Sequence, residues 1–115
     1  MPEGLYSPQE TTYGIHGGDV ETSLVLAFRP ETMDMGLARD FRSTAETTAI
    51  SPIGAISYGW IASDLNPHGV VGEAHLATAA KGHATADKMV RDTIALLQNV
   101  AATPLDGFAP LTPPF

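Results

Sequence analysis

The chain has 115 residues, which is the length of one small domain or of part of a larger one. Hydrophobic residues make up 43% of it and charged residues 17%, a balance that predicts a folded, globular unit and excludes a disordered tail. Thirteen acidic against six basic side chains give a formal net charge of −7, which disfavours nucleic acid and anionic membrane surfaces as partners.

The sequence lacks cysteine, a secretory signal and a membrane-spanning segment, and these absences bear on the cellular compartment. It contains no cysteine, so disulfides, thiolate nucleophiles and thiolate metal sites are excluded. The first residues have neither the basic nor the apolar region of a secretory signal, and no apolar run approaches the ~20 residues that span a bilayer. We therefore expect a cytoplasmic protein with no membrane anchor.

The first regular element is predicted after a glycine pair. Residues 1–12 contain two prolines and several turn formers, which predicts an irregular, exposed segment leading into the domain. A helix is predicted over residues 19–28, with acidic side chains in its first turn and a proline after its end. Its expected buried face consists of Val20, Leu24, Val25, Ala27 and Phe28.

The middle of the chain lacks sustained periodicity. Residues 31–54 are predicted to be mostly loop. Residues 56–61 combine aromatic and β-branched side chains between turn formers, which predicts a short strand. Asn66, Pro67 and Gly69 then predict a tight turn.

A long helix is predicted from about residue 76 to residue 101. Its apolar side chains recur at helical spacing, and the prolines of residues 103–115 cannot continue it. The predicted elements are two helices and one strand joined by long irregular connections, which is too little regular structure for an independent core. We therefore expect the chain to depend on segments outside it. The predicted buried face of this helix is Ala86, Val90, Thr93, Ile94, Leu97 and Val100.

His16 is the first candidate for chemistry, because it precedes two glycines and a predicted helix start. Glycines there allow backbone amides to approach a ligand, and an imidazole can move a proton near neutral pH. The alternative is a loop histidine that only caps or packs, which is the more common case on spacing alone.

Glu21 is the second candidate, five positions after His16. A buried Glu21 would need a partner for its charge, so it could orient His16 or brace the loop. The alternative is an exposed glutamate that suits the first turn of the helix.

The remaining histidines are His68, His75 and His83. None of them is paired at the i, i+4 spacing of a helical zinc site, and no cysteine supplements them. Solvated side chains are therefore the better interpretation, and no metal site is predicted from these three residues.

Two blocks resemble the creatininase family of amidohydrolases. They are HGGDVETSLVLAFRP, which begins at His16, and GWIASDLNPHGVVGEAHLATAAKG, residues 59–82. The resemblance covers about residues 4–101 and implies an α/β chain, the carboxy-terminal part of a three-layer α/β/α fold, with two helices and about one to three strands. Residues 13–102 would form the carboxy-terminal half of such a domain, and residues 103–115 a proline-rich tail.

The resemblance also implies a reaction. Members hydrolyse linear or cyclic amides with two divalent metal ions, usually zinc or manganese, whose bound hydroxide attacks the carbonyl. The histidine matching His16 would donate a proton to the departing nitrogen, with Glu21 in support. Tyr13, Gly17 and Gly18 are the expected substrate-binding residues.

This sequence also departs from the family pattern. The family's metal ligands lie in its amino-terminal half, so we predict that this chain supplies none and that the isolated chain is inactive. Thr11, Thr12 and Tyr13 stand where creatinine-cleaving members carry tryptophan, which disfavours creatinine as substrate. Glu73 and Ala74 replace the Asp-Pro that often starts the last helix, which weakens that start.

Two functional hypotheses follow from the resemblance. The first is part of a metal-dependent amidohydrolase, either a homo-oligomer, hexameric by resemblance, or associated with an amino-terminal half. The second is a catalytically inactive fragment or an oligomerisation unit of a creatininase-like protein.

Overall fold

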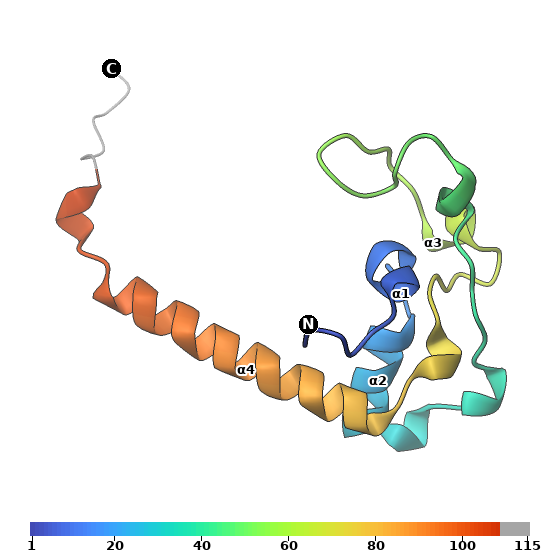
Figure 1. The fold of residues 1–115 in the computed structure, drawn as a ribbon, viewed down its shortest axis with the longest axis horizontal. Coiled ribbons are helices and arrows are strands. Elements are labelled where there is room, and N and C mark those ends of the chain that lie inside the picture. The colour runs from blue at the N-terminus through green and yellow to red at the C-terminus, as the bar shows by residue number, and fades with distance from the viewer. Residues whose placement is uncertain (109–115) are drawn as a thin grey trace.

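The computed structural model describes residues 1–108, and they form helices joined by long irregular segments (Figure 1). The α-helices are α1 (Pro8–Tyr13), α2 (Asp19–Phe28), α3 (Ala62–Leu65) and α4 (Ala79–Ala102). Short 3-10 turns lie between and after them, at Pro30–Thr32, Met35–Leu37, Thr44–Thr47, Ala74–Leu76 and Leu105–Gly107.

Helix α1 lies in the segment for which irregular structure was expected, and that prediction is wrong. The side chain of Ser7 caps the helix by accepting the backbone N–H of Glu10 at 2.9 Å, and Pro8 occupies the first turn. Tyr6 and Glu10 are buried, so the segment is not uniformly exposed either. The remaining residues of the segment, up to the N-cap, stay outside regular helix.

Helix α2 has the predicted bounds but buries a different face from the expected one. Its buried side chains are Asp19, Thr22 and Ser23, whereas Phe28 is 60% exposed. The predicted burial of Phe28 and Val25 is therefore wrong. The polar face is buried because α4 packs against it, and its groups find partners there.

The contact between α2 and α4 depends on close backbone approach. Gly82 of α4 lies so near the carbonyl of Ser23 that a Cβ atom at this position would collide with it. The Lys81 ammonium pairs with buried Asp19 at 2.5 Å, and Ser23 Oγ donates to the same carboxylate at 2.9 Å. The hydroxyls of Tyr6 and Thr85 add a buried hydrogen bond at 2.7 Å.

The three-layer α/β/α arrangement finds no support in the described residues, and no strand is formed among residues 1–108. The predicted strand at residues 56–61 is an irregular, largely exposed loop in which Ile56 is 85% exposed. Strand-forming side chains produce a strand only where a second backbone offers hydrogen-bonding partners, and no such ladder reaches this loop in the described part of the chain. The fold is therefore α-rich.

Two isolated antiparallel bridges hold the irregular segments together. His16 pairs with Val71, and Phe41 pairs with Gly72. Val71 is fully buried and Leu65 nearly so, which places the small apolar core beside these bridges. The predicted turn at residues 66–69 is confirmed by a hydrogen bond from the Gly69 amide to the Asn66 carbonyl at 2.9 Å.

Helix α4 confirms the predicted long helix, although it begins later than expected. Thr78 is its N-cap and accepts the Lys81 amide at 3.2 Å, while Ala74–Leu76 forms a separate 3-10 turn. The helix ends at Ala102, before Pro104, as predicted. The proline-rich tail was predicted to span residues 103–115, of which residues 109–115 lie outside the described part.

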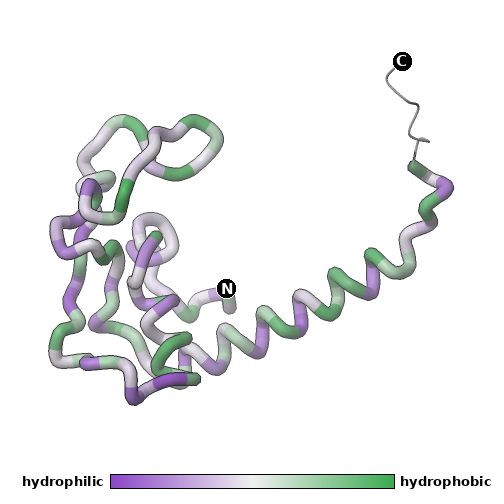
Figure 2. The backbone as a smooth tube through the Cα atoms, turned by 180° about the vertical axis from the view of Figure 1, so that it is seen from behind, coloured by the Kyte–Doolittle hydropathy of each residue, from purple (hydrophilic) through white to green (hydrophobic). Residues whose placement is uncertain are grey.

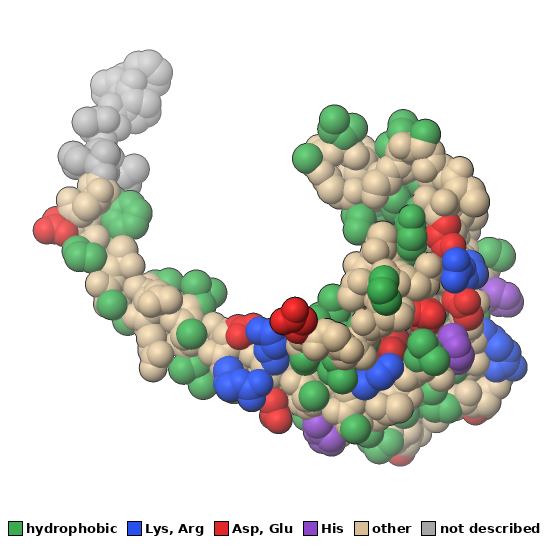
Figure 3. Space-filling model, viewed as in Figure 1, with side chains coloured by type: hydrophobic (Ala, Val, Ile, Leu, Met, Phe, Trp, Pro, Cys, Tyr) green, Lys and Arg blue, Asp and Glu red, His purple; other side chains and the backbone are tan. Residues whose placement is uncertain are grey.

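Most of α4 extends away from the other helices, as Figures 1 and 2 show. The radius of gyration is 18.7 Å, against ~13 Å for a compact chain of this length. Every residue from Met89 to Ala102 is exposed, so most of the predicted apolar face of this helix is uncovered in the described chain, and of that face Ala86 alone is half-buried. Hydrophobic side chains gather along this part of α4 in Figure 3. No helix in residues 1–108 is both long and apolar enough to cross a bilayer.

Candidate functional site

His16 lies in the loop that joins α1 to α2, and its side chain is exposed. The loop backbone is fixed against a distant segment: the Val71 amide donates to the His16 carbonyl at 2.7 Å, and the Ile15 and His16 amides point to the Val71 carbonyl at 3.1 and 3.3 Å. The imidazole is therefore presented to solvent from a backbone that is hydrogen-bonded to Val71.

The two glycines after His16 shape the turn into α2. Gly17 has φ +68°, a conformation that favours glycine, and its carbonyl accepts the Thr22 hydroxyl at 3.1 Å. Gly18 is the N-cap residue of α2 and is buried. The first turn of α2 therefore fixes the loop from the carboxy-terminal side of His16.

Glu21 is exposed and belongs to this first turn. Its Oε2 accepts the Gly18 amide at 3.0 Å, which stabilises the start of the helix. Among the described residues, no hydrogen bond joins Glu21 to the His16 side chain. The exposure of Glu21 and its hydrogen bond to the Gly18 amide correspond to the alternative interpretation, an exposed glutamate in the first turn of the helix.

Tyr13 is the last residue of α1 and is half-buried, three residues before His16. Gly17 lines an open hollow of about 350 Å³, together with Glu21 and Thr22 from α2 and apolar side chains of the loop that follows. Tyr13 and Gly18 do not line this hollow. The structure thus brings Gly17 and Glu21 to one depression beside the His16 loop.

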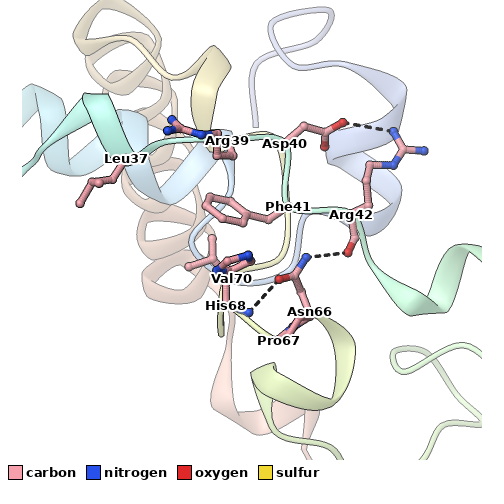
Figure 4. A pocket seen from close by; sticks show the side chains of 9 residues that line it. All are labelled: Leu37, Arg39, Asp40, Phe41, Arg42, Asn66, Pro67, His68 and Val70. Atoms are coloured by element: carbon pink, nitrogen blue, oxygen red, sulfur yellow. Dashed lines mark hydrogen bonds and ion pairs between the residues drawn. The ribbon is translucent and has the colours of Figure 1, made fainter.

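A larger hollow of about 780 Å³ shares Leu37, Phe41 and Val70 with the first one (Figure 4). Its rim is polar: the Asn66 amide donates to the Arg42 carbonyl at 2.9 Å, and the Arg42 guanidinium lies 3.6 Å from Asp40. His68 stacks at a tilt on Phe41, with ring centroids 5.5 Å apart. His16 lines neither hollow in the described structure.

Glu10 is a buried carboxylate beside the His16 loop that the sequence did not single out. It is 1% exposed, and its oxygens accept the amides of Val20 at 3.2 Å and Glu73 at 2.7 Å. Gly14 and Gly18 approach it so closely that a side chain at either position would strike the carboxyl group. The signal that could have found Glu10 is the Ser-Pro-Gln-Glu run of residues 7–10, a spacing typical of a helix start.

Burial raises the pKa of Glu10 above its ordinary value of 4.5. The negative charge of Glu21 adds to this effect, while the amides of Glu73, Val20 and Asp19 oppose it by hydrogen bonding to the carboxylate. The net result is a carboxyl group that takes up a proton more readily than an exposed glutamate.

The sequence model of the Creatininase family, described as creatinine amidohydrolase, matches residues 1–97. The chain belongs to the creatininase family. No curated protein and no solved structure matches the chain. Membership in the creatininase family indicates amidohydrolase-type function on a small-molecule amide, and the family is generally metal-dependent.

The described residues of this creatininase-family chain do not fit a metal pair. Residues 1–108 contain no group of three or more His, Asp or Glu side chains close enough to hold an ion. Glu73 and His75 do form a Glu-x-His triplet, although metal ligands were expected in the family's amino-terminal half alone. The Glu73 carboxylate is occupied by the Ser7 hydroxyl, and His75 is exposed without a third ligand beside the pair.

Proposed function

We propose that this chain supplies the acid–base histidine of an amidohydrolase that cleaves the C–N bond of a linear or cyclic amide. The observation that carries the proposal is the placement of His16: an exposed imidazole on a loop fixed by Val71 on one side and by the first turn of α2 on the other. A catalytic proton donor needs this combination of access and fixed position.

In the proposed reaction water adds to the amide carbonyl and releases one proton to solvent, and the C–N bond of the resulting tetrahedral anion breaks as its C=O bond re-forms. The bonding electrons go to nitrogen, and the His16 imidazolium donates its proton to that nitrogen, so that an amine and a carboxylic acid leave. Without this proton the departing group would be an amide anion, which is a very poor leaving group. The histidine regains a proton from solvent, to which it is exposed.

The neighbouring residues have supporting roles in this proposal. Glu21 holds the Gly18 amide and so fixes the turn after His16; we assign it this role and not direct proton transfer. Gly17 and Tyr13 would bind substrate on either side of the histidine. Gly18 would contribute through its backbone only, because it is buried at the start of α2.

The proposal places the divalent metal pair, zinc or manganese, on ligands outside residues 1–108. Another segment of the family domain or another polypeptide would carry them, in a cytoplasmic homo-oligomer or in a complex with an amino-terminal half. The exposed apolar face of α4 supports such an association, because exposed apolar patches favour protein contacts.

The test complements this chain with the metal-binding half of a creatininase-family enzyme. Amine release is measured from creatinine and from a panel of linear and cyclic amides, with zinc or manganese added. We expect turnover of at least one amide, and a loss of about 10²–10⁴-fold in kcat for His16→Ala. The control is His75→Ala, which also removes an exposed imidazole. Equal activity of His16→Ala and wild type would disprove the assigned role.

A second candidate function is a non-catalytic oligomerisation unit. The specific observation in its favour is the wide apolar face of α4, on which Val90, Leu97 and Val100 are 58%, 60% and 61% exposed. Absence of amide hydrolysis in the complemented protein, together with stable self-association of the chain, would favour this candidate over the enzyme.

A further inference from the structure

Glu10 is a buried charged group for which the proposed reaction has no direct use. It lies in α1, six residues before His16, and three glycines surround its carboxyl group: Gly14, Gly18 and Gly72. Two of these glycines flank His16 at two residues on either side. The loop that carries the histidine is therefore built around the Glu10 carboxylate.

The carboxylate also links segments that are distant in sequence. One oxygen accepts the Val20 amide in the first turn of α2, and the other accepts the Glu73 amide, 63 residues along the chain from Glu10. Residue 73 lies two positions after Val71, whose backbone pairs with His16. The two sides that hold the His16 loop are thus joined to each other through a single side chain.

The three glycines approach the Glu10 carboxyl group more closely than a residue with a side chain could. A Cβ atom on Gly72, whose φ is +144°, would meet both the Glu10 carboxylate and the backbone of Gly18. No buried side-chain polar atom in residues 1–108 lacks a partner, so the carboxylate is satisfied where it lies. A buried carboxylate that accepts hydrogen bonds from backbone amides constrains the segments that donate to it.

We propose that Glu10 is a positioning residue for His16: its carboxylate ties the start of α2 to the segment at residues 71–73 and thereby sets the position of the His16 loop. The importance of this role for catalysis rests on the proposed function. The structural part does not, because it concerns only how the loop is held. The two can therefore fail separately.

The first test is made on the full wild-type chain by nuclear magnetic resonance. The side-chain carboxyl carbon of Glu10 is titrated with pH while the amide protons of Val20 and Glu73 are followed. We expect both amide protons to shift with the same midpoint as the carboxyl carbon, because both donate to it. Amide chemical shifts that stay constant while Glu10 titrates would overturn the proposal. Because this test uses wild type alone, it does not depend on whether a variant folds.

The second test compares Glu10→Gln with Glu3→Gln, which neutralises an exposed glutamate of the same segment. The glutamine retains one acceptor and turns N–H donors toward the second amide. We expect hydrogen exchange at Val20 or Glu73 to accelerate about tenfold, as for the loss of a hydrogen bond to a charged group. The amide signals of residues 15–18 should shift, whereas Glu3→Gln should leave them unchanged.

The link to catalysis is measured in the complemented enzyme. We expect Glu10→Gln to lower kcat by about 100-fold with little change in KM, since a small misplacement of a catalytic group costs that much. A folded Glu10→Gln chain with unchanged signals at residues 15–18 and unchanged kcat would overturn the positioning role. Failure of the proposed function is recognised separately, by unchanged turnover in His16→Ala.

Discussion

The carboxyl group of Glu10 occupies a place where negative charge is costly. Burial and the nearby Glu21 raise its pKa, and the three backbone amides only partly offset that rise. The folded chain therefore binds a proton at Glu10 more tightly than the unfolded chain does. A pH-dependent contribution to stability follows from this difference.

The sign of that contribution can be tested. Because the pKa of Glu10 is raised on folding, its contribution is fully present below pH 4.5, the ordinary value, and is lost as the pH rises through the raised pKa. We expect the free energy of unfolding of wild type, measured in urea, to fall relative to that of Glu10→Gln across this window. Groups that do not interact with Glu10 cancel in the difference between the two proteins.

The matched control for this titration is Glu3→Gln, whose difference from wild type should stay flat across the same pH range. Stability of wild type that rises relative to Glu10→Gln with increasing pH would show that the carboxylate is favoured on folding. Such a rise would mean that the amide hydrogen bonds outweigh the burial of the charge.

Single residues also show where sequence reasoning succeeds and where it stops. His16 and the two glycines could be recognised because their meaning is local: an imidazole before a turn and a helix start. Glu10 was missed because its burial depends on Glu73, which only the folded chain brings to it. The spacing of Ser7 and Glu10 is typical of a helix start, but such a spacing carries no information on whether the glutamate is buried.

At the scale of elements, the two main helices could be predicted and their packing could not. Periodicity gave the bounds of α2 and the approximate length of α4. The buried face of α2 was predicted wrongly, because the face that packs is decided by Gly82 and Lys81 on α4 and not by the apolar residues of α2. The expected strand failed for the same reason: its formation depends on a partner elsewhere.

Gly82 provides a test of the packing between α2 and α4. Alanine in place of glycine usually stabilises a helix interior by about 0.5–1 kcal/mol. At position 82 the added Cβ would collide with the Ser23 carbonyl and with Ala27. We therefore expect Gly82→Ala to destabilise the chain by roughly 1–3 kcal/mol, measured by thermal or urea unfolding.

The control for this substitution is Gly59→Ala, since a Cβ at Gly59 would meet no atom within 4 Å. Its effect should stay within about 0.5 kcal/mol. A Gly82→Ala chain as stable as wild type would mean that the two helices are not held at the distance described.

At the scale of the whole molecule, the outer part of α4 is the feature that most needs a partner. Its apolar side chains were predicted from periodicity to be buried, yet residues 89–102 are exposed in the described chain. The periodicity is nevertheless meaningful, since a stripe of this width is typical of a helix that packs on something.

Self-association through this face can be measured by sedimentation equilibrium. We expect the double substitution Val90→Lys, Leu97→Lys to weaken association by about tenfold or more, because both side chains lie on the apolar stripe. Gln98→Lys adds a charge to the same helix away from the stripe and should have little effect. A wild-type chain that stays monomeric at all concentrations would count against association through α4.

Membership in the creatininase family indicates amidohydrolase-type function for the whole molecule. The proposed reaction depends on His16 as the proton donor. If the histidine acts as a general acid, the loss of kcat on its removal must increase with the basicity of the departing nitrogen. Without a proton donor, an aliphatic amine must leave as an unstable anion, whereas the anion of a nitroaniline is stabilised and leaves readily.

The most direct measurement is therefore the kcat of wild type and His16→Ala in the complemented enzyme on two amides with the same acyl group, an alkylamide and a nitroanilide. We predict a loss of ~100-fold or more for the alkylamide and a much smaller loss for the nitroanilide. Equal losses on both substrates would contradict proton donation by His16 to the leaving nitrogen.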